Sequence, residues 1–125
     1  MQPVQVQVIG TGTSTPIIPD TKQNPFNIGL GVTIASGGTG TTAWLVEHCF
    51  DFSTVMSPTW NGTTGVTWFP NSGLSGGTTA GSGTTASPLN GNYAFPVAAI
   101  RLNVVTAAVA TSLVVMNLIQ AVESP

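Results

Sequence analysis

Few residues of this sequence can perform acid–base or metal chemistry, and most of them fall in one short stretch. His48 is the single histidine and Cys49 the single cysteine, with Glu47 and Asp51 beside them. Neighbouring residues of a strand point to opposite faces, so His48 and Cys49 cannot act on each other as base and nucleophile. The two carboxylates have no second histidine or cysteine with which to form a zinc site, and the sequence contains no acidic calcium loop. We therefore expect no catalytic residue, no metal site and no cofactor, and we predict that the protein is not an enzyme.

Two segments are rich in glycine, as phosphate-binding loops are: residues 10–12 (GTG) and 37–40 (GGTG). Neither has the lysine followed by Ser or Thr of a nucleotide-binding loop, and neither has the spacing of a dinucleotide-binding turn. Turn formation explains both segments.

The chain is nearly free of charge. Its 125 residues include 2 Lys+Arg and 4 Asp+Glu, or 5% charged residues, whereas about 25% is usual for a soluble domain. The length favours a single domain over 1–125. Lys22 and Arg101 alone cannot neutralise a nucleic-acid backbone, so we expect no specific nucleic-acid partner. A surface of Thr, Ser, Asn, Gln and Gly favours coverage by partner chains; the alternative is a secreted β domain with a threonine-rich surface.

The single cysteine excludes an intrachain disulfide, and its position in the apolar run 44–52 predicts a buried thiol. A small domain without disulfides is typical of synthesis in a reducing cytosol. Residues 1–9 alternate instead of forming the apolar block of a signal peptide. Residues 104–122 are apolar but interrupted by Thr, Ser, Asn and Gln, so we expect a core segment and no membrane span.

Alternation of apolar and polar residues predicts strands in the first half of the chain. Val4, Val6 and Val8 share one face of an N-terminal strand, which with the loop 10–20 forms an N-terminal arm over 1–20. Residues 27–35 and 41–52 alternate in the same way. Gly29 and Gly31 occupy the polar face of the second strand, where another backbone has room to approach.

In the second half, residues 66–69 predict a short strand closed by Pro70, and 97–105 predict another strand. Residues 71–92, rich in Gly, Ser and Thr, predict a long loop that is either flexible or ordered by a partner. Residues 109–120 favour a strand that forms a hairpin with 97–105, while a helix over 107–122 is the alternative. The pattern predicts an all-β fold: a single antiparallel sandwich or jelly-roll-like domain with long Gly/Ser/Thr loops.

Aromatic residues give the best candidates for a binding surface. Trp60 lies in a loop segment, TWNG, and is predicted to be an exposed anchor for a partner. The alternative is a sugar platform that also involves Trp44, Trp68 and Tyr93, although few carboxylates are available to complete it. The N-terminal strand could join a neighbour's sheet edge. The predicted interface residues are Val4, Val6, Trp60, Phe69, Tyr93 and Arg101.

Several segments together resemble a group of short virion proteins of tailed phages. The segments are 23–31 (QNPFNIGLG), 46–51 (VEHCFD), 58–61 (PTWN), 68–70 (WFP), 92–103 (NYAFPVAAIRLN) and 118–121 (LIQA). The resemblance covers most of the chain outside 71–91, where this sequence has a longer Gly/Thr/Ser segment than the group leads us to expect. It implies a β protein of the decoration or cement type on the capsid surface, and it brings no catalytic residues.

Four functions follow as hypotheses. The first is a phage structural protein, made in the host cytoplasm, that decorates or cements the virion. It would bind the major capsid protein and neighbouring copies of itself as a dimer or trimer. The second is a tail, neck or fibre-associated component, and the third is a carbohydrate-binding module. The fourth, an enzyme, has too few titratable groups in this sequence.

Overall fold

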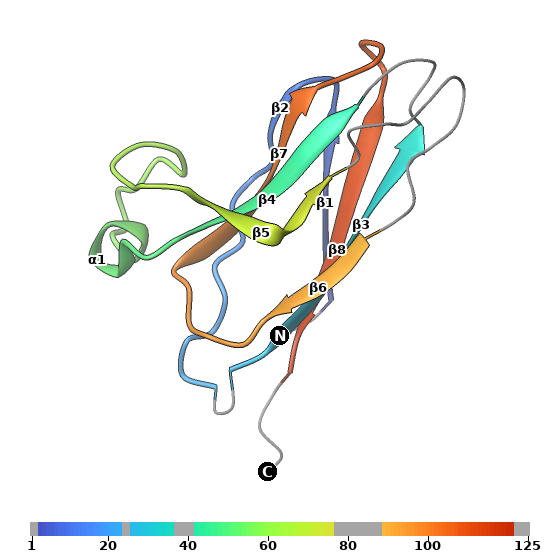
Figure 1. Cartoon of the computed structure of the whole chain (residues 1–125). Helices are drawn as coiled ribbons and strands as arrows, with labels where there is room; N and C mark the ends of the chain where they lie inside the picture. The colour runs from blue at the N-terminus through green and yellow to red at the C-terminus, as the bar shows by residue number, and fades with distance from the viewer. Residues whose placement is uncertain (1–2, 24–25, 37–41, 77–88, 122–125) are drawn as a thin grey trace.

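The computed structural model describes residues 3–23, 26–36, 42–76 and 89–121, and within them two antiparallel four-stranded sheets face each other (Figure 1). The first sheet, here the A sheet, contains in spatial order β1 (Val4–Ile9), β8 (Leu113–Gln120), β3 (Ile28–Ser36) and β6 (Leu89–Tyr93). The B sheet contains in spatial order β2 (Gly12–Thr13), β7 (Ala99–Thr106), β4 (Ala43–Cys49) and β5 (Phe69–Gly76). The predicted all-β sandwich is confirmed.

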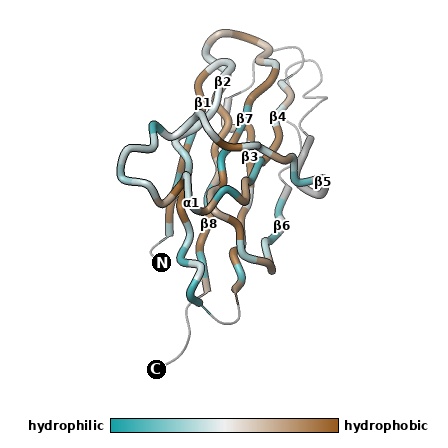
Figure 2. Tube along the Cα trace, turned by 90° about the vertical axis from the view of Figure 1, so that its left-hand side faces the viewer, coloured by the Kyte–Doolittle hydropathy of each residue, from teal (hydrophilic) through white to brown (hydrophobic). Residues whose placement is uncertain are grey.

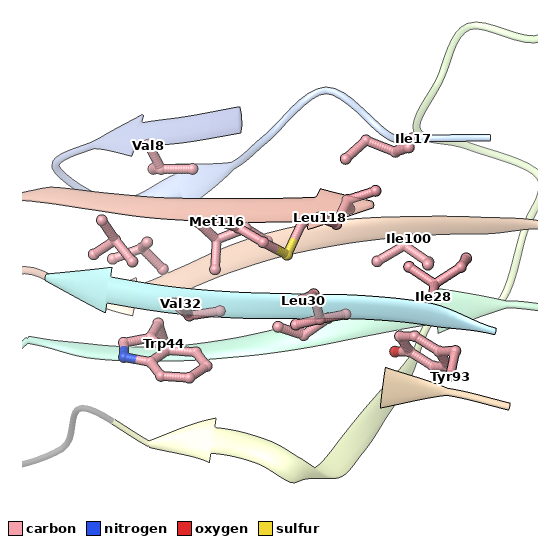
Figure 3. Packing of buried hydrophobic residues seen from close by; sticks show 14 of the residues in the cluster. Val8, Ile17, Ile28, Leu30, Val32, Trp44, Tyr93, Ile100, Met116 and Leu118 are labelled. Carbon is pink, nitrogen blue, oxygen red and sulfur yellow. The ribbon is translucent and has the colours of Figure 1, made fainter. Parts of the chain in front are cut away.

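The core lies between the two sheets and follows from the alternation of the strands. Apolar and polar residues alternate along the chain (Figure 2), and the inward residues are buried. Met116 and Val32 of the A sheet meet Val46 and Leu102 of the B sheet in one apolar cluster, and each is at most 1% exposed. Figure 3 shows Trp44 and Tyr93 toward opposite ends of this interior. Apolar burial of this kind is the main stabilising contribution to a sandwich.

A sharp turn at Gly10 takes the chain from the A sheet to the B sheet. Gly10 has a φ of +73°, and a Cβ at this position would lie 3.1 Å from the carbonyl oxygen of Ala110. Both features favour glycine. After this turn, the predicted loop 10–20 contains the short strand β2. Further on in the same segment, Ile17 forms a single bridge with Ile100 of the B sheet.

The predicted strand 41–52 ends earlier, at Cys49, and is followed by the one-turn helix α1 (Phe52–Val55). The carboxylate of Asp51 accepts a hydrogen bond from the backbone N–H of Thr67, and its carbonyl accepts one from Val55. These bonds fold residues 50–68 into an excursion that stands beside the B sheet (Figure 1). The alternating pattern continues to Phe52, so it did not show that the strand ends at Cys49. A one-turn helix has too few residues to show a helical period in the sequence.

Two predictions around Pro70 are wrong. The strand does not end at Pro70; β5 begins at Phe69 and passes through it. The proline is tolerated because β5 is an edge strand that pairs only with β4 among the described strands. The predicted loop 71–92 therefore contains most of β5 and most of β6, while 77–88 lie outside the described residues.

The C-terminal segment is a strand, β8, and the helical alternative for 107–122 is excluded over Leu113–Gln120. The predicted hairpin with residues 97–105 is wrong, because β8 pairs with β1 and β3 in the opposite sheet. The connection crosses between the sheets and is held by two hydroxyls. Thr42 accepts a hydrogen bond from the N–H of Ala108, and Ser112 accepts one from Val109.

A candidate interface at the edge of the sandwich

Five aromatic side chains gather where β4, β5 and the end of β6 meet. The ring centroids of Phe50, Phe69 and Phe95 lie 5.2, 6.2 and 5.9 Å from that of His48. Tyr93 lies 5.1 Å from His48 on the inner side. The phenylalanines also contact one another, with 5.8 Å between Phe50 and Phe69 and 6.1 Å between Phe50 and Phe95. The distances are those of favourable ring pairs, so the five rings form one packed cluster.

His48 and Tyr93 form the buried base of this cluster. The His48 Nδ1 atom lies 2.9 Å from the Tyr93 hydroxyl oxygen, and the two residues are 8% and 0% exposed. Burial lowers the pKa of His48 below its ordinary value of 6.5, with the Glu47 carboxylate acting in the opposite direction. Burial also raises the pKa of Tyr93 to about 12, although a hydrogen bond from Asn71 acts to lower it. Both groups are therefore neutral near pH 7, and their bond serves packing.

Phe50, Phe69 and Phe95 form the outer layer, here called the aromatic patch. They are 44%, 44% and 47% exposed. Each ring is thus anchored on one side by the cluster and open to solvent on the other. Clustered, partly fixed aromatic rings are typical of protein interfaces, because little side-chain entropy remains to be lost on binding. The arrangement can bind an apolar partner surface.

Arg101 is engaged within the chain. Its Nε donates to Glu47 Oε1 at 2.7 Å, and the two side chains are 14% and 12% exposed. The guanidinium lies 4.2 Å from the centroid of the Trp68 ring, and Asn103 Nδ2 donates to the same Glu47 oxygen. The arginine that we expected at a contact therefore positions strands β4 and β7 and the Trp68 segment.

Trp60 is half-buried and packs inside the excursion of residues 50–68. Its Nε1 donates to the carbonyl oxygen of Thr64 at 2.8 Å. Together with Phe52, Val66 and Trp68 it packs against a second apolar cluster formed by Cys49, Val55, Ala98 and Ala99. The expectation of an exposed anchor is therefore not met, because its indole covers the outer side of the B sheet. Cys49 is 0% exposed, as predicted, and burial raises the pKa of its thiol.

The structure brings together only two of the six predicted interface residues. Phe69 and Tyr93 meet at His48, whereas Val4 and Val6 lie on β1, half-buried against the core. Phe50 and Phe95 were missed. Phe50 continues the alternation of Trp44, Val46 and His48, and Phe95 lies in the FPV segment after Tyr93. Each pattern draws attention to its phenylalanine, but neither distinguishes an exposed ring from a core ring.

The described residues contain no group of three or more His, Cys, Asp or Glu side chains placed to hold a metal ion. Nor does any helix in this part of the chain combine the length and apolar character needed to cross a membrane. No protein-family model, curated protein or solved structure matches the chain.

Proposed function

We propose that this protein is a phage virion structural protein that decorates or cements the capsid, binding the major capsid protein and neighbouring copies. The aromatic patch supports this proposal most directly. It is an exposed apolar surface on a chain whose remaining surface is nearly uncharged, which suits dense packing among other subunits. The segments that resemble tailed-phage virion proteins include all three of its rings: Phe50 in 46–51, Phe69 in 68–70 and Phe95 in 92–103.

The size of the aromatic patch favours a weak contact that is repeated many times. At about 200 Å² for each side chain, the exposed fractions of 44%, 44% and 47% leave on the order of 270 Å² to be buried. Burial would contribute about 7 kcal/mol, which is comparable with the ~4–15 kcal/mol cost of association. A single patch therefore gives modest affinity. Repetition over a capsid lattice would make the attachment stable, because linked sites bind far more tightly than one site.

The first experiment is quantitative protein composition of purified particles from a phage that carries this gene. A copy number comparable with that of the major capsid protein is expected. A handful of copies per particle would favour the tail, neck or fibre alternative. Absence from the particle would overturn the proposal, and glycan binding would then be tested next.

The second experiment measures binding to particles that lack the protein. Phe50→Ser, Phe69→Ser and Phe95→Ser are expected to lower the bound amount at least tenfold when combined. Val105→Ser is the matched control, because Val105 is 57% exposed near the far end of β7 and lies outside the aromatic patch. Equal binding by the triple variant and the control would contradict the role given to the patch.

A further inference from the structure

The outer face of the A sheet carries a hollow of about 400 Å³. The residues that line it include Gln5 of β1, Gly29 and Gly31 of β3, and Asn117 and Ile119 of β8. Gly29 and Gly31 contribute only backbone to it, and a Cβ built on Gly29 would meet no atom within 4 Å. The hollow therefore exists because two positions of β3 lack side chains on the face that points away from the core.

A projecting apolar side chain stands directly beside this hollow. Ile119 of β8 is the cross-strand partner of Gly29, and it is 51% exposed. One row along, Asn117 pairs with Gly31 and accepts a hydrogen bond from the Gln5 amide. A two-fold axis that lies in the plane of the interface, parallel to such a face, makes the face complementary to itself, since each projection can enter the other copy's hollow.

The same face carries no charge among the described residues. Its outward side chains are amides, hydroxyls and aliphatic groups, among them Gln5 on β1, Thr33 on β3, Asn92 on β6 and Ile119 on β8. A surface that meets its own copy would bring like charges together, so an uncharged face lacks the main barrier to self-association. The described charged groups lie elsewhere: Glu47 and Arg101 on the B sheet, Asp51 after β4, and Asp20 and Lys22 in the loop before β3.

The area of the face indicates which class of contact it can form. Four strands spaced about 4.8 Å apart, at about 3.3 Å per residue, give a face of roughly 19 by 25 Å. Two such faces bury on the order of 900 Å², which is below the ~1,200 Å² of stable specific interfaces and in the range of weak, transient ones. A contact of this size is typical of a weak, reversible dimer and is too small for an obligate one.

We infer that two copies of this chain pair face to face through their A sheets, with Ile119 of each copy seated over Gly29 and Gly31 of the other. Sheets packed in this way lie about 10 Å apart, a distance that one layer of interdigitating side chains fills. The inference rests on the proposed function in that it assigns a surface to the contact between neighbouring copies. The aromatic patch, at the edge of the sandwich, stays free for the capsid.

Sedimentation equilibrium of the purified chain over a concentration series measures the pairing. We expect a monomer–dimer equilibrium. Gly29→Val fills the hollow with a side chain that strands accept, and Ile119→Ala removes the projection; each is expected to raise the dissociation constant at least tenfold. Val105→Ala is the matched control, since it shortens an exposed apolar residue that lies on the B sheet. Thermal melts confirm that each variant is folded.

Mixing the two variants gives the sharpest test. In a mixed pair, the intact Ile119 of the Gly29→Val copy faces an intact hollow, and the shortened residue 119 of the other copy faces the filled one. The mixed dimer is therefore expected to be tighter than either variant's own dimer, because it keeps one intact contact between Ile119 and a hollow.

Three results would overturn the inference: a monomer at all concentrations, a dimer that neither variant weakens, or variants that weaken pairing without recovery on mixing. Glycan binding by a monomer that Gly29→Val abolishes would assign the hollow to a different occupant. The particle composition is measured separately. A monomer that is abundant in particles would overturn only the dimer, and a dimer absent from particles would overturn only the virion role.

Discussion

The Nδ1 atom of His48 lies 2.9 Å from the hydroxyl oxygen of Tyr93, and this contact joins the two sheets at one edge of the sandwich. His48 is on β4 of the B sheet and Tyr93 ends β6 of the A sheet, so the bond spans a gap that no strand pairing closes in the described structure. The three rings of the aromatic patch rest on this pair. The residue pair therefore fixes both the edge of the core and the surface proposed to bind the capsid.

Stability is expected to fall when the pH drops below about 6.5, the ordinary pKa of histidine, because burial lowers the pKa of His48 in the folded chain. The unfolded chain then binds the proton more readily than the folded chain, so the free energy of unfolding decreases with falling pH. The full contribution is present above 6.5. Chemical denaturation between pH 7.5 and about 5.5 measures it, a range that stays above the ordinary pKa values of the carboxyl groups, about 3.9 for Asp and about 4.3 for Glu.

His48→Gln is the control for this pH effect. It keeps a polar side chain near Tyr93 but cannot titrate, so its free energy of unfolding should be less dependent on pH over the same range. The groups around His48 are the three phenylalanines, Tyr93, whose pKa of about 12 keeps it protonated throughout, and the Glu47 carboxylate, which opposes the effect of burial on the His48 pKa. An unchanged pH dependence in the variant would assign the effect to other groups.

Glu47→Gln is expected to destabilise the chain by about 1–3 kcal/mol. The change leaves the Arg101 guanidinium, on a side chain only 14% exposed, without its carboxylate partner. Arg101→Met should cost a similar amount, and the double variant should cost less than the two single changes together. Urea unfolding of all four proteins measures the coupling, and simple additivity would show that the pair contributes nothing beyond its separate contacts.

Gly10→Ala and Gly29→Ala form a matched pair with opposite expectations. At Gly10 the φ of +73° and the carbonyl oxygen of Ala110 both oppose a Cβ, so we expect a loss of about 1–3 kcal/mol. At Gly29 a Cβ has open space, so alanine should be neutral or stabilise by up to about 1 kcal/mol. Thermal melts at a low protein concentration separate these effects from pairing. A larger loss at Gly29 than at Gly10 would contradict the role of the turn.

Sequence patterns predicted where most strands lie, but they failed to predict which strands pair. Alternation located β1, β3 and β7 because each has one face in the core. Pairing depends on contacts between distant segments. Among the described strands, β4 and β5 are the only sequence-consecutive pair that is hydrogen-bonded. The local sequence contains no signal that β7 and its successor β8 belong to different sheets, so the expected hairpin between them was wrong.

The same limit applies to the candidate site. His48 and Phe50 occupy alternate positions of one run, yet one is buried and the other half exposed. Their difference depends on Tyr93 and Phe95, which are more than forty residues further along the chain. Periodicity assigns a residue to a face of a strand, whereas exposure at the edge of a sandwich depends on which distant loop covers that edge.

The Cys49 thiol reports on local opening of the excursion formed by residues 50–68. The thiol is 0% exposed beneath Val55 and its neighbours, and burial raises its pKa, so a thiol reagent should react slowly with the folded chain. Val55→Ala removes two buried methyl groups from the cluster and should destabilise the excursion by about 1–3 kcal/mol. Because the core between the sheets is untouched, labelling should accelerate by roughly tenfold or more through local opening.

Val114→Ala, in the main core, is the matched control. It should lower the free energy of global unfolding while leaving labelling under native conditions slower than in Val55→Ala. Equal rates in the two variants would show that Cys49 becomes accessible only when the whole sandwich unfolds.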